Sequence, residues 1–191
     1  MNTKVIIAGV GGQGILLASD ILCEAAMKAG FDTKKSEVHG MSQRGGDVIS
    51  HVIFGEKVYS PLISYDEADI ILSFEQVEAL RNIDYLKKDG VIIVNTMKIL
   101  PLPVASGIAD YPNDSIGEIK KFAKNTIVID AESIANELGN RRVMNIVLLG
   151  IMARNVESIK KEIWLNALRN NVPQKTIDVN LKAFERGYSF S

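Results

Sequence analysis

Three glycines near the start of the chain, Gly9, Gly11 and Gly14, have the spacing G-x-G-x-x-G. They follow an apolar run at 5–8 and precede an Ala-rich apolar segment, the order expected for a buried strand, a tight turn and a helix start. Backbone N–H groups at such a helix N-terminus can approach a phosphate or another anion closely. The candidate anion-binding turn therefore consists of Gly9, Gly11, Gly12, Gln13 and Gly14.

The glycine turn has a plainer interpretation, because any strand–helix unit needs glycines where the chain turns tightly. Dinucleotide binding would also require an acidic residue about 20 positions further on, after the second strand. Asp32 precedes that predicted strand, and Glu37 ends a lysine-rich one. No Gly-Lys-Ser/Thr follows the turn, which excludes a Walker-type phosphate loop.

A second segment, residues 36–47, combines several chemical groups within a short glycine-rich stretch. It should lie at the carboxyl end of the second strand, the edge where open α/β sheets bind ligands. An arginine there could hold a carboxylate or phosphate through two parallel hydrogen bonds, and a histidine could move a proton near neutral pH. We favour a functional or interface role over a solvated loop. The residues concerned are Glu37, His39, Gln43, Arg44, Gly45 and Gly46.

Glu75 directly follows a predicted buried strand at 69–74 and begins a helix. It is interpreted either as an acidic residue that stabilises the helix N-terminus or as a ligand contact beside the glycine turn. His51 lies within a strand and is interpreted as a structural histidine bonded to a neighbouring backbone group. Cys23, the one cysteine, falls within the first helix and is expected to be a core thiol. No zinc-site spacing is present.

Strand and helix patterns alternate up to residue 130, and helices alone follow. Strand patterns cover 3–8, 32–37, 48–54, 58–60, 69–74, 91–95 and 126–130. Helical spacing covers 14–29, 75–86, 116–124, 131–138, 142–154, 158–168 and 173–186. This order predicts an α/β fold: a doubly wound, mostly parallel sheet with a C-terminal helical wrap.

The strands at 48–54 and 58–60 are expected to pair as an antiparallel hairpin insertion through a three-residue connection. No linker composition appears along the chain. We therefore predict a single domain over 1–191, with the sheet core at about 1–130 and the helical wrap at about 131–191.

The 191 residues carry 22 Lys and Arg against 23 Asp and Glu, a formal net charge of −1, which does not suggest a nucleic-acid partner. No apolar run reaches the roughly 18 residues of a membrane span, and the N-terminal residues lack a signal-peptide pattern. A single cysteine excludes an intrachain disulfide framework. We expect a cytoplasmic protein.

Three blocks of sequence together resemble the gamma-type domain of 2-oxoacid:ferredoxin oxidoreductases, with the small (beta) subunits of the indolepyruvate branch the most similar. They are residues 9–16, 36–46 and 59–63. Further matches follow in order along nearly the whole chain: Ala68-Asp69, Phe74-Glu75, Glu78 to Arg81 and Asn145 to Gly150.

The resemblance implies oxidative decarboxylation of a 2-oxoacid on thiamine diphosphate, with electrons passed through iron–sulfur clusters to ferredoxin and release of an acyl-coenzyme A. It implies that a larger partner subunit carries thiamine diphosphate, Mg and the clusters, and that coenzyme A is a co-substrate. This chain would complete that assembly while binding no cofactor alone. One cysteine agrees with this, because such clusters usually take four thiolates.

The same resemblance implies that residues 37–46 named above face the partner or the mouth of the active site. It implies that part of coenzyme A or a substrate carboxylate rests at the glycine turn and Glu75. It leaves open which 2-oxoacid is used and whether the isolated chain forms a homodimer. Two other hypotheses remain: a stand-alone NAD(P)-binding enzyme, and a non-catalytic module that binds a nucleotide or coenzyme A.

Overall fold

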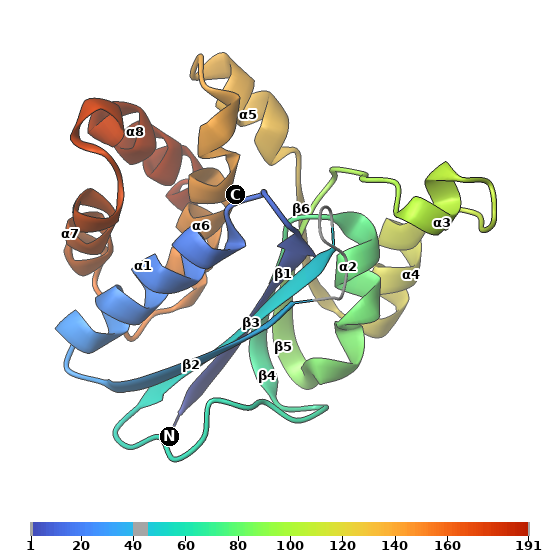
Figure 1. Ribbon diagram of the computed structural model, residues 1–191. Helices are drawn as coiled ribbons and strands as arrows, with labels where there is room; N and C mark the ends of the chain where they lie inside the picture. Colours follow the sequence, from blue (N-terminus) through green and yellow to red (C-terminus); the bar gives the residue numbers. More distant parts are fainter. Residues whose placement is uncertain (1, 40–45, 191) are drawn as a thin grey trace.

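A computed structural model describes residues 2–39 and 46–190, and it arranges them as one sheet with helices on both faces (Figure 1). The strands are β1 (Thr3–Val10), β2 (Asp32–His39), β3 (Asp47–Gly55), β4 (Ala68–Ser73), β5 (Leu86–Asn95) and β6 (Asn125–Ile129). The helices are α1 (Ile15–Lys28), α2 (Gln76–Arg81), α3 (Leu102–Ala105), α4 (Ser115–Phe122), α5 (Ala131–Glu137), α6 (Met144–Asn155), α7 (Lys161–Asn171) and α8 (Ile177–Tyr188).

The sheet has the order β2-β3-β1-β4-β5-β6. Strands β1, β4, β5 and β6 pair in parallel, whereas β3 is antiparallel to both β1 and β2. All the strands except β3 therefore run in one direction. The predicted α/β class and mostly parallel sheet are confirmed. The carboxyl ends of the strands that share this direction meet at one edge of the sheet, and the glycine turn begins there, after β1.

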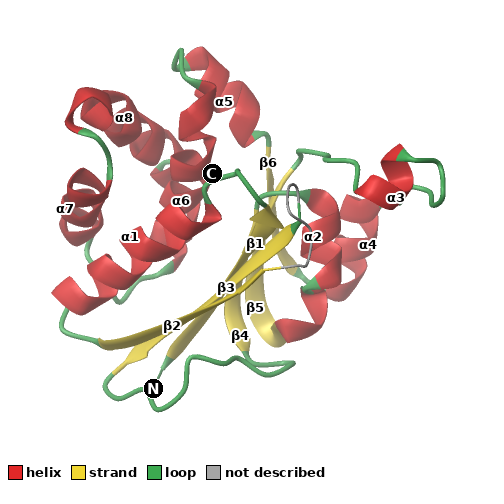
Figure 2. Cartoon of the chain, in the orientation of Figure 1, coloured by secondary structure: helices red, strands yellow, loops and turns green. Residues whose placement is uncertain are grey.

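Side chains that alternate along the strands form a core on each face of the sheet. Helices cover both of these faces (Figure 2). In β1, Val5 and Ile7 pack into the core beneath α1, α6 and α8, while Ile6 and Ala8 pack into the core beneath α2 and α4. This is the two-residue period of a strand that is buried on both faces. Helices α5 to α8 follow the last strand, as the sequence predicts for the C-terminal wrap.

The predicted hairpin between 48–54 and 58–60 is wrong. Strand β3 is already paired along both of its edges, with β1 and β2, so no edge remains for residues 58–60. Instead, the backbone N–H of Val58 donates to the Asp32 carboxylate at 2.8 Å. Strand β3 therefore pairs antiparallel with the strand that precedes it in the sequence, β2, and with β1.

The structural role predicted for His51 is confirmed. Its Nδ1 accepts a hydrogen bond from the backbone N–H of Ile63 at 3.1 Å, which ties the segment after β3 to the sheet. Burial lowers the pKa of this imidazole, so the acceptor form is retained at neutral pH.

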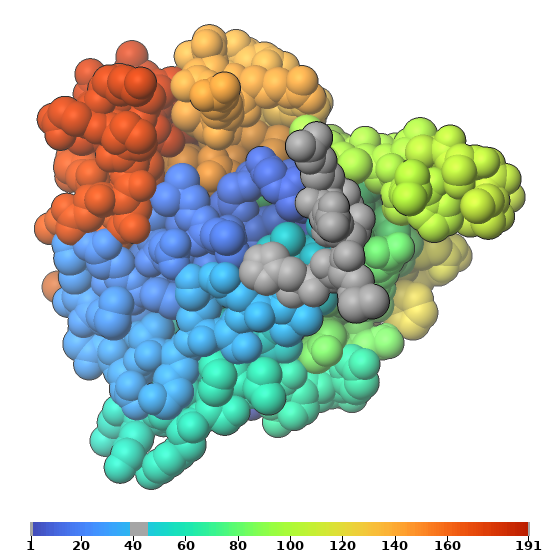
Figure 3. All heavy atoms as spheres, in the orientation of Figure 1, coloured from blue at the N-terminus to red at the C-terminus, as the bar shows by residue number. Residues whose placement is uncertain are grey.

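Residues 98–111, here called the arm, project from the body of the molecule and contain α3 (Figure 3). The arm exposes several large apolar side chains, among them Leu102 and Ile108. Across the described residues, no helix combines the length and apolar character needed to cross a membrane.

Candidate functional site

The glycine turn joins β1 to α1 at the carboxyl edge of the sheet. Gly12 and Gly14 have φ angles of +96° and +87°, in the left-handed region that favours glycine. Gly14 is also the N-cap of α1, and a Cβ on it would lie 2.5 Å from Nδ2 of Asn145. The turn therefore needs glycine for both its backbone conformation and its close packing against α6.

The side chain of Gln13 fixes the turn from inside. Its Oε1 accepts from the backbone N–H of Val10 at 2.6 Å. Its Nε2 donates to the carbonyl of Phe74 at 3.2 Å and to Sδ of Met97 at 3.3 Å. Gln13 thus connects the end of β1 to the segments that follow β4 and β5, and its amide is engaged within the chain.

The two candidate segments meet in space. The backbone N–H of Gly11 donates to the carbonyl of Gly46 at 2.9 Å, so the glycine turn and the end of the second segment lie side by side. Gln43, Arg44 and Gly45 lie outside the described residues, as does the side chain of His39.

Glu37 lies on the edge strand β2, opposite Ser50. Its carboxylate forms an ion pair with Lys35 at 2.6 Å, and Lys35 also pairs with Asp20 of α1 at 2.5 Å. Among the described contacts, Glu37 therefore joins a charge cluster beside α1 and does not touch the glycine turn. Its role at a partner interface stays a prediction.

Glu75 is 1% exposed and caps α2. One carboxylate oxygen accepts from the N–H groups of Val77 and Glu78 at 2.6 and 3.0 Å. The other accepts from Ile99 N at 3.1 Å and Tyr111 Oη at 2.5 Å. These contacts are those of a residue that caps a helix N-terminus, which is the first of the two roles considered for Glu75. Because both carboxylate oxygens already accept hydrogen bonds, they have little capacity left for a ligand.

A hollow of about 540 Å³ lies beside the glycine turn. It is lined by Gly12, Gln13, Gly14, Met97, Arg141, Arg142, Met144 and Asn145. Arg141 forms an ion pair with Glu132, whereas Arg142 forms none within the described residues. Both arginines are exposed. Backbone N–H groups of a helix start next to a guanidinium can bind an anionic group.

Sequence reasoning missed Arg141 and Arg142, which lie about 130 residues from the turn. The only local signal is a pair of adjacent basic residues just before α6. Their approach to the turn depends on α6 packing against the start of α1, where Asn145 Nδ2 lies 3.5 Å from the carbonyl of Gly14.

The sheet order bears on the dinucleotide hypothesis. In dinucleotide-binding sheets the second strand lies directly beside the first, so that its terminal acidic residue reaches the ribose. Here β3 separates β1 from β2, and Glu37 at the end of β2 is paired with Lys35. The geometry therefore does not reproduce the ribose-binding half of that fingerprint.

The donor set of this chain does not fit an iron–sulfur cluster. Cys23 is half-buried in α1, and burial raises the pKa of its thiol to about 11. In the part of the chain that the structure describes, no three His, Cys, Asp or Glu side chains are grouped as metal ligands. A cluster would need thiolates that this chain does not contain.

The known proteins that are similar to this chain belong to one class, the oxidoreductases that act on 2-oxoacids. The family model described as pyruvate ferredoxin/flavodoxin oxidoreductase matches residues 4–190. The indolepyruvate oxidoreductase subunit IorB of Thermococcus kodakarensis is 46% identical, over 96% of this chain and 93% of that protein. The ketoisovalerate oxidoreductase subunit VorA of Methanothermobacter marburgensis is 31% identical over 97% of this chain, but over only 36% of its own length.

Among solved structures, the gamma subunit of a keto/oxoacid ferredoxin oxidoreductase from Geobacter sulfurreducens superposes with a TM-score of 0.72. It is 26% identical to this chain, and the match covers 97% of this chain and 96% of that one. The six-stranded architecture described above is therefore that of a gamma-type subunit.

Proposed function

Because this chain belongs to the pyruvate ferredoxin/flavodoxin oxidoreductase family, we propose that it is the small subunit of a 2-oxoacid:ferredoxin oxidoreductase that acts on indolepyruvate or a similar aryl pyruvate. The observation that carries the proposal is the match to an IorB subunit over nearly the full length of both chains. The match covers 93% of that IorB subunit, whereas it covers only about a third of the VorA subunit.

In this proposal a larger partner subunit binds thiamine diphosphate, Mg and the iron–sulfur clusters and passes electrons to ferredoxin. Support comes from the residues of this chain, whose one cysteine cannot ligate a cluster. The small subunit then contributes the carboxyl edge of its sheet, where Gly11 and Gly46 adjoin. In the sequence, the segment that contains Glu37, His39, Gln43, Arg44 and Gly45 directly precedes Gly46.

Reconstitution with the larger subunit tests this role. We expect the purified chain alone to be colourless and inactive, and to form a stable complex with the thiamine- and iron-containing subunit of its host. The complex should oxidise indolepyruvate with ferredoxin as acceptor. Turnover by the isolated chain would contradict the proposal, as would a larger subunit that is fully active without it.

The hollow beside the glycine turn is proposed to receive an anionic part of coenzyme A. The N-terminal N–H groups of α1 and the guanidinium of Arg142 provide the positive charge, and Asn145 lines the same hollow. Glu75 caps α2 and is not among the residues that line this hollow.

Replacement of Arg142 by alanine should raise the KM for coenzyme A about tenfold or more in the assembled enzyme, because a charge-assisted hydrogen bond contributes about 1.5–3 kcal/mol. The KM for the 2-oxoacid should change little. Arg169→Ala, which removes an exposed arginine on α7, is the matched control and should leave both constants unchanged. An unaltered KM for coenzyme A in Arg142→Ala would exclude this location.

The stand-alone NAD(P)-binding function is the weaker candidate, because β3 intervenes between β1 and β2. A thermal-shift experiment separates it. A nicotinamide nucleotide present at 100 times its dissociation constant would stabilise the chain by about 2.7 kcal/mol, whereas we expect no shift.

A further inference from the structure

A second hollow, of about 400 Å³, lies between α2 and the arm and is separate from the one beside the glycine turn. Its charged lining consists of Glu78 and Arg81 on α2 and Asp47 at the start of β3. Its outer rim includes Leu100 and Leu102 of the arm, which are 56% and 79% exposed. Figure 3 shows the arm standing out from the body beside this region.

Glu78 is the unusual residue in this hollow. Its side chain is only 4% exposed, and Oε1 accepts from the Arg81 guanidinium at 3.0 Å. Within the described residues, the buried Oε2 has no hydrogen-bond partner. A buried acceptor without a partner costs about 1–3 kcal/mol, and more when it is charged. Among the residues that the structure describes, no donor satisfies this acceptor.

The charge balance of the hollow favours a cation. Two carboxyl groups, on Glu78 and Asp47, face one guanidinium, and Arg81 is itself about half exposed. Burial raises the pKa of Glu78 to about 7, with Asp47 and Glu75 adding to the shift and Arg81 opposing it. A cation placed against Oε2 would restore the ionised form.

We propose that this hollow is a docking socket for the larger subunit, and that Glu78 Oε2 accepts a hydrogen bond from a lysine or arginine side chain of that subunit. The inference rests on the proposed function. The exposed Leu100 and Leu102 fit the aliphatic stem of such a side chain, whose charged head reaches the buried carboxylate. Arginine is enriched in the buried cores of interfaces.

A relative supports a protein as the occupant. In VorA the region that matches this chain is 36% of a longer polypeptide, so the same domain occurs joined to other protein segments.

The test measures the affinity of the purified chain for the larger subunit, with Glu78→Gln as the principal variant. Glutamine keeps the shape of the side chain but removes the charge. We expect binding to weaken by about 30-fold or more, the loss typical of removing one partner of a buried charged hydrogen bond. Thermal unfolding of the isolated variant should not occur at a lower temperature, because a neutral amide is less costly to bury than a carboxylate.

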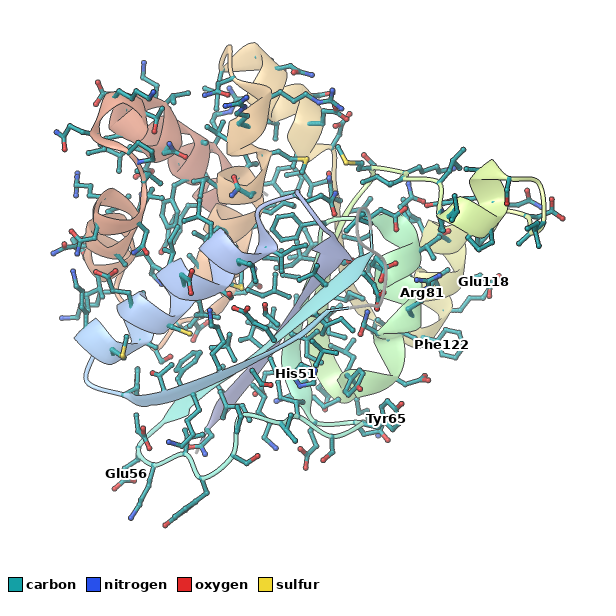
Figure 4. The ribbon with its side chains drawn as sticks, in the orientation of Figure 1. His51, Glu56, Tyr65, Arg81, Glu118 and Phe122 are labelled. Carbon is teal, nitrogen blue, oxygen red and sulfur yellow. The ribbon has the colours of Figure 1, made fainter. Side chains whose placement is uncertain are left out.

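Two further variants complete the comparison. Glu56→Gln removes an exposed carboxylate at the opposite end of β3 and should bind like the wild type (Figure 4). Leu102→Ser changes an exposed residue of the arm, cannot disturb the core, and should also weaken binding.

The pH dependence of binding gives an independent readout. The titratable and charged groups that face Glu78 are Glu75 and Arg81 on α2, Asp47 on β3 and Tyr111 beyond α3. Docking requires the ionised carboxylate, so affinity should fall about tenfold between pH 8 and pH 6 as free Glu78 takes up a proton. Glu78→Gln should abolish that slope.

The outcomes separate the two proposals. If the wild-type chain does not bind the larger subunit at all, the proposed function fails. If the wild type binds and Glu78→Gln binds equally well with an unchanged pH slope, the complex exists and the socket is overturned.

Discussion

Replacement of Glu75 by alanine should lower the free energy of unfolding by about 3–5 kcal/mol, because the change removes a helix cap and leaves further buried donors without an acceptor. The carboxylate accepts from two N–H groups of α2, from Ile99 N and from Tyr111 Oη. It therefore holds α2 and both ends of the arm together. Denaturant unfolding of the isolated chain measures the loss.

Two variants calibrate this result. Tyr111→Phe removes one donor and should cost about 1.5–3 kcal/mol, the contribution of one hydrogen bond to a charged group. Glu118→Ala removes an exposed acidic residue from the first turn of α4 (Figure 4), where an N-terminal charge contributes only about 0.3–1 kcal/mol. Equal losses for Glu75→Ala and Glu118→Ala would show that Glu75 acts only through its charge at the helix end.

Replacement of Gly14 by alanine should destabilise the chain by about 2–4 kcal/mol, since left-handed strain and overpacking each cost about 1–3 kcal/mol. The strain arises from φ of +87°, and the overpacking from a Cβ that would lie 2.5 Å from Asn145 Nδ2. Urea unfolding monitored by circular dichroism would report both together.

A matched glycine separates the two causes. Gly12 has φ of +96°, but nothing lies within 4 Å of the Cβ it would carry, so Gly12→Ala should show the strain alone. Asn145→Ala combined with Gly14→Ala should be less destabilising than the sum of the single changes, because it removes Nδ2 and Cγ, which would lie 2.5 and 3.1 Å from the added Cβ. Strict additivity of these two changes would mean that Asn145 does not limit the turn.

Much of the fold follows from local patterns. The alternation in β1 and the β-branched run in β5 predict strands because each residue's face depends only on its position along the strand. The positions of the first helix and of the C-terminal helices follow from helical spacing in the same way. The glycine turn can likewise be predicted from the sequence, because its glycines directly precede a helical pattern.

Local patterns also led to an error. Residues 58–60 look like a strand, and a short connection precedes them, so a hairpin with 48–54 is the expected pairing. The polar, lysine-rich β2 appears the weaker partner, yet it occupies that edge of β3 over eight residue pairs. Two segments can compete to pair with the same edge of a strand. The residue pattern within each segment does not show which of them forms the pair.

What the sequence alone determined was the α/β class, the place of the glycine turn, the lack of thiolates for a cluster and the resemblance to gamma-type subunits. Three features follow from tertiary packing alone: Glu75 caps α2 and anchors the arm, Arg142 lines the same hollow as the glycine turn, and Glu78 is buried with one oxygen that is unpaired among the described residues. The reason is physical: periodicity and backbone preference are properties of neighbouring residues, whereas burial and hydrogen-bond partners depend on segments that are distant in the chain.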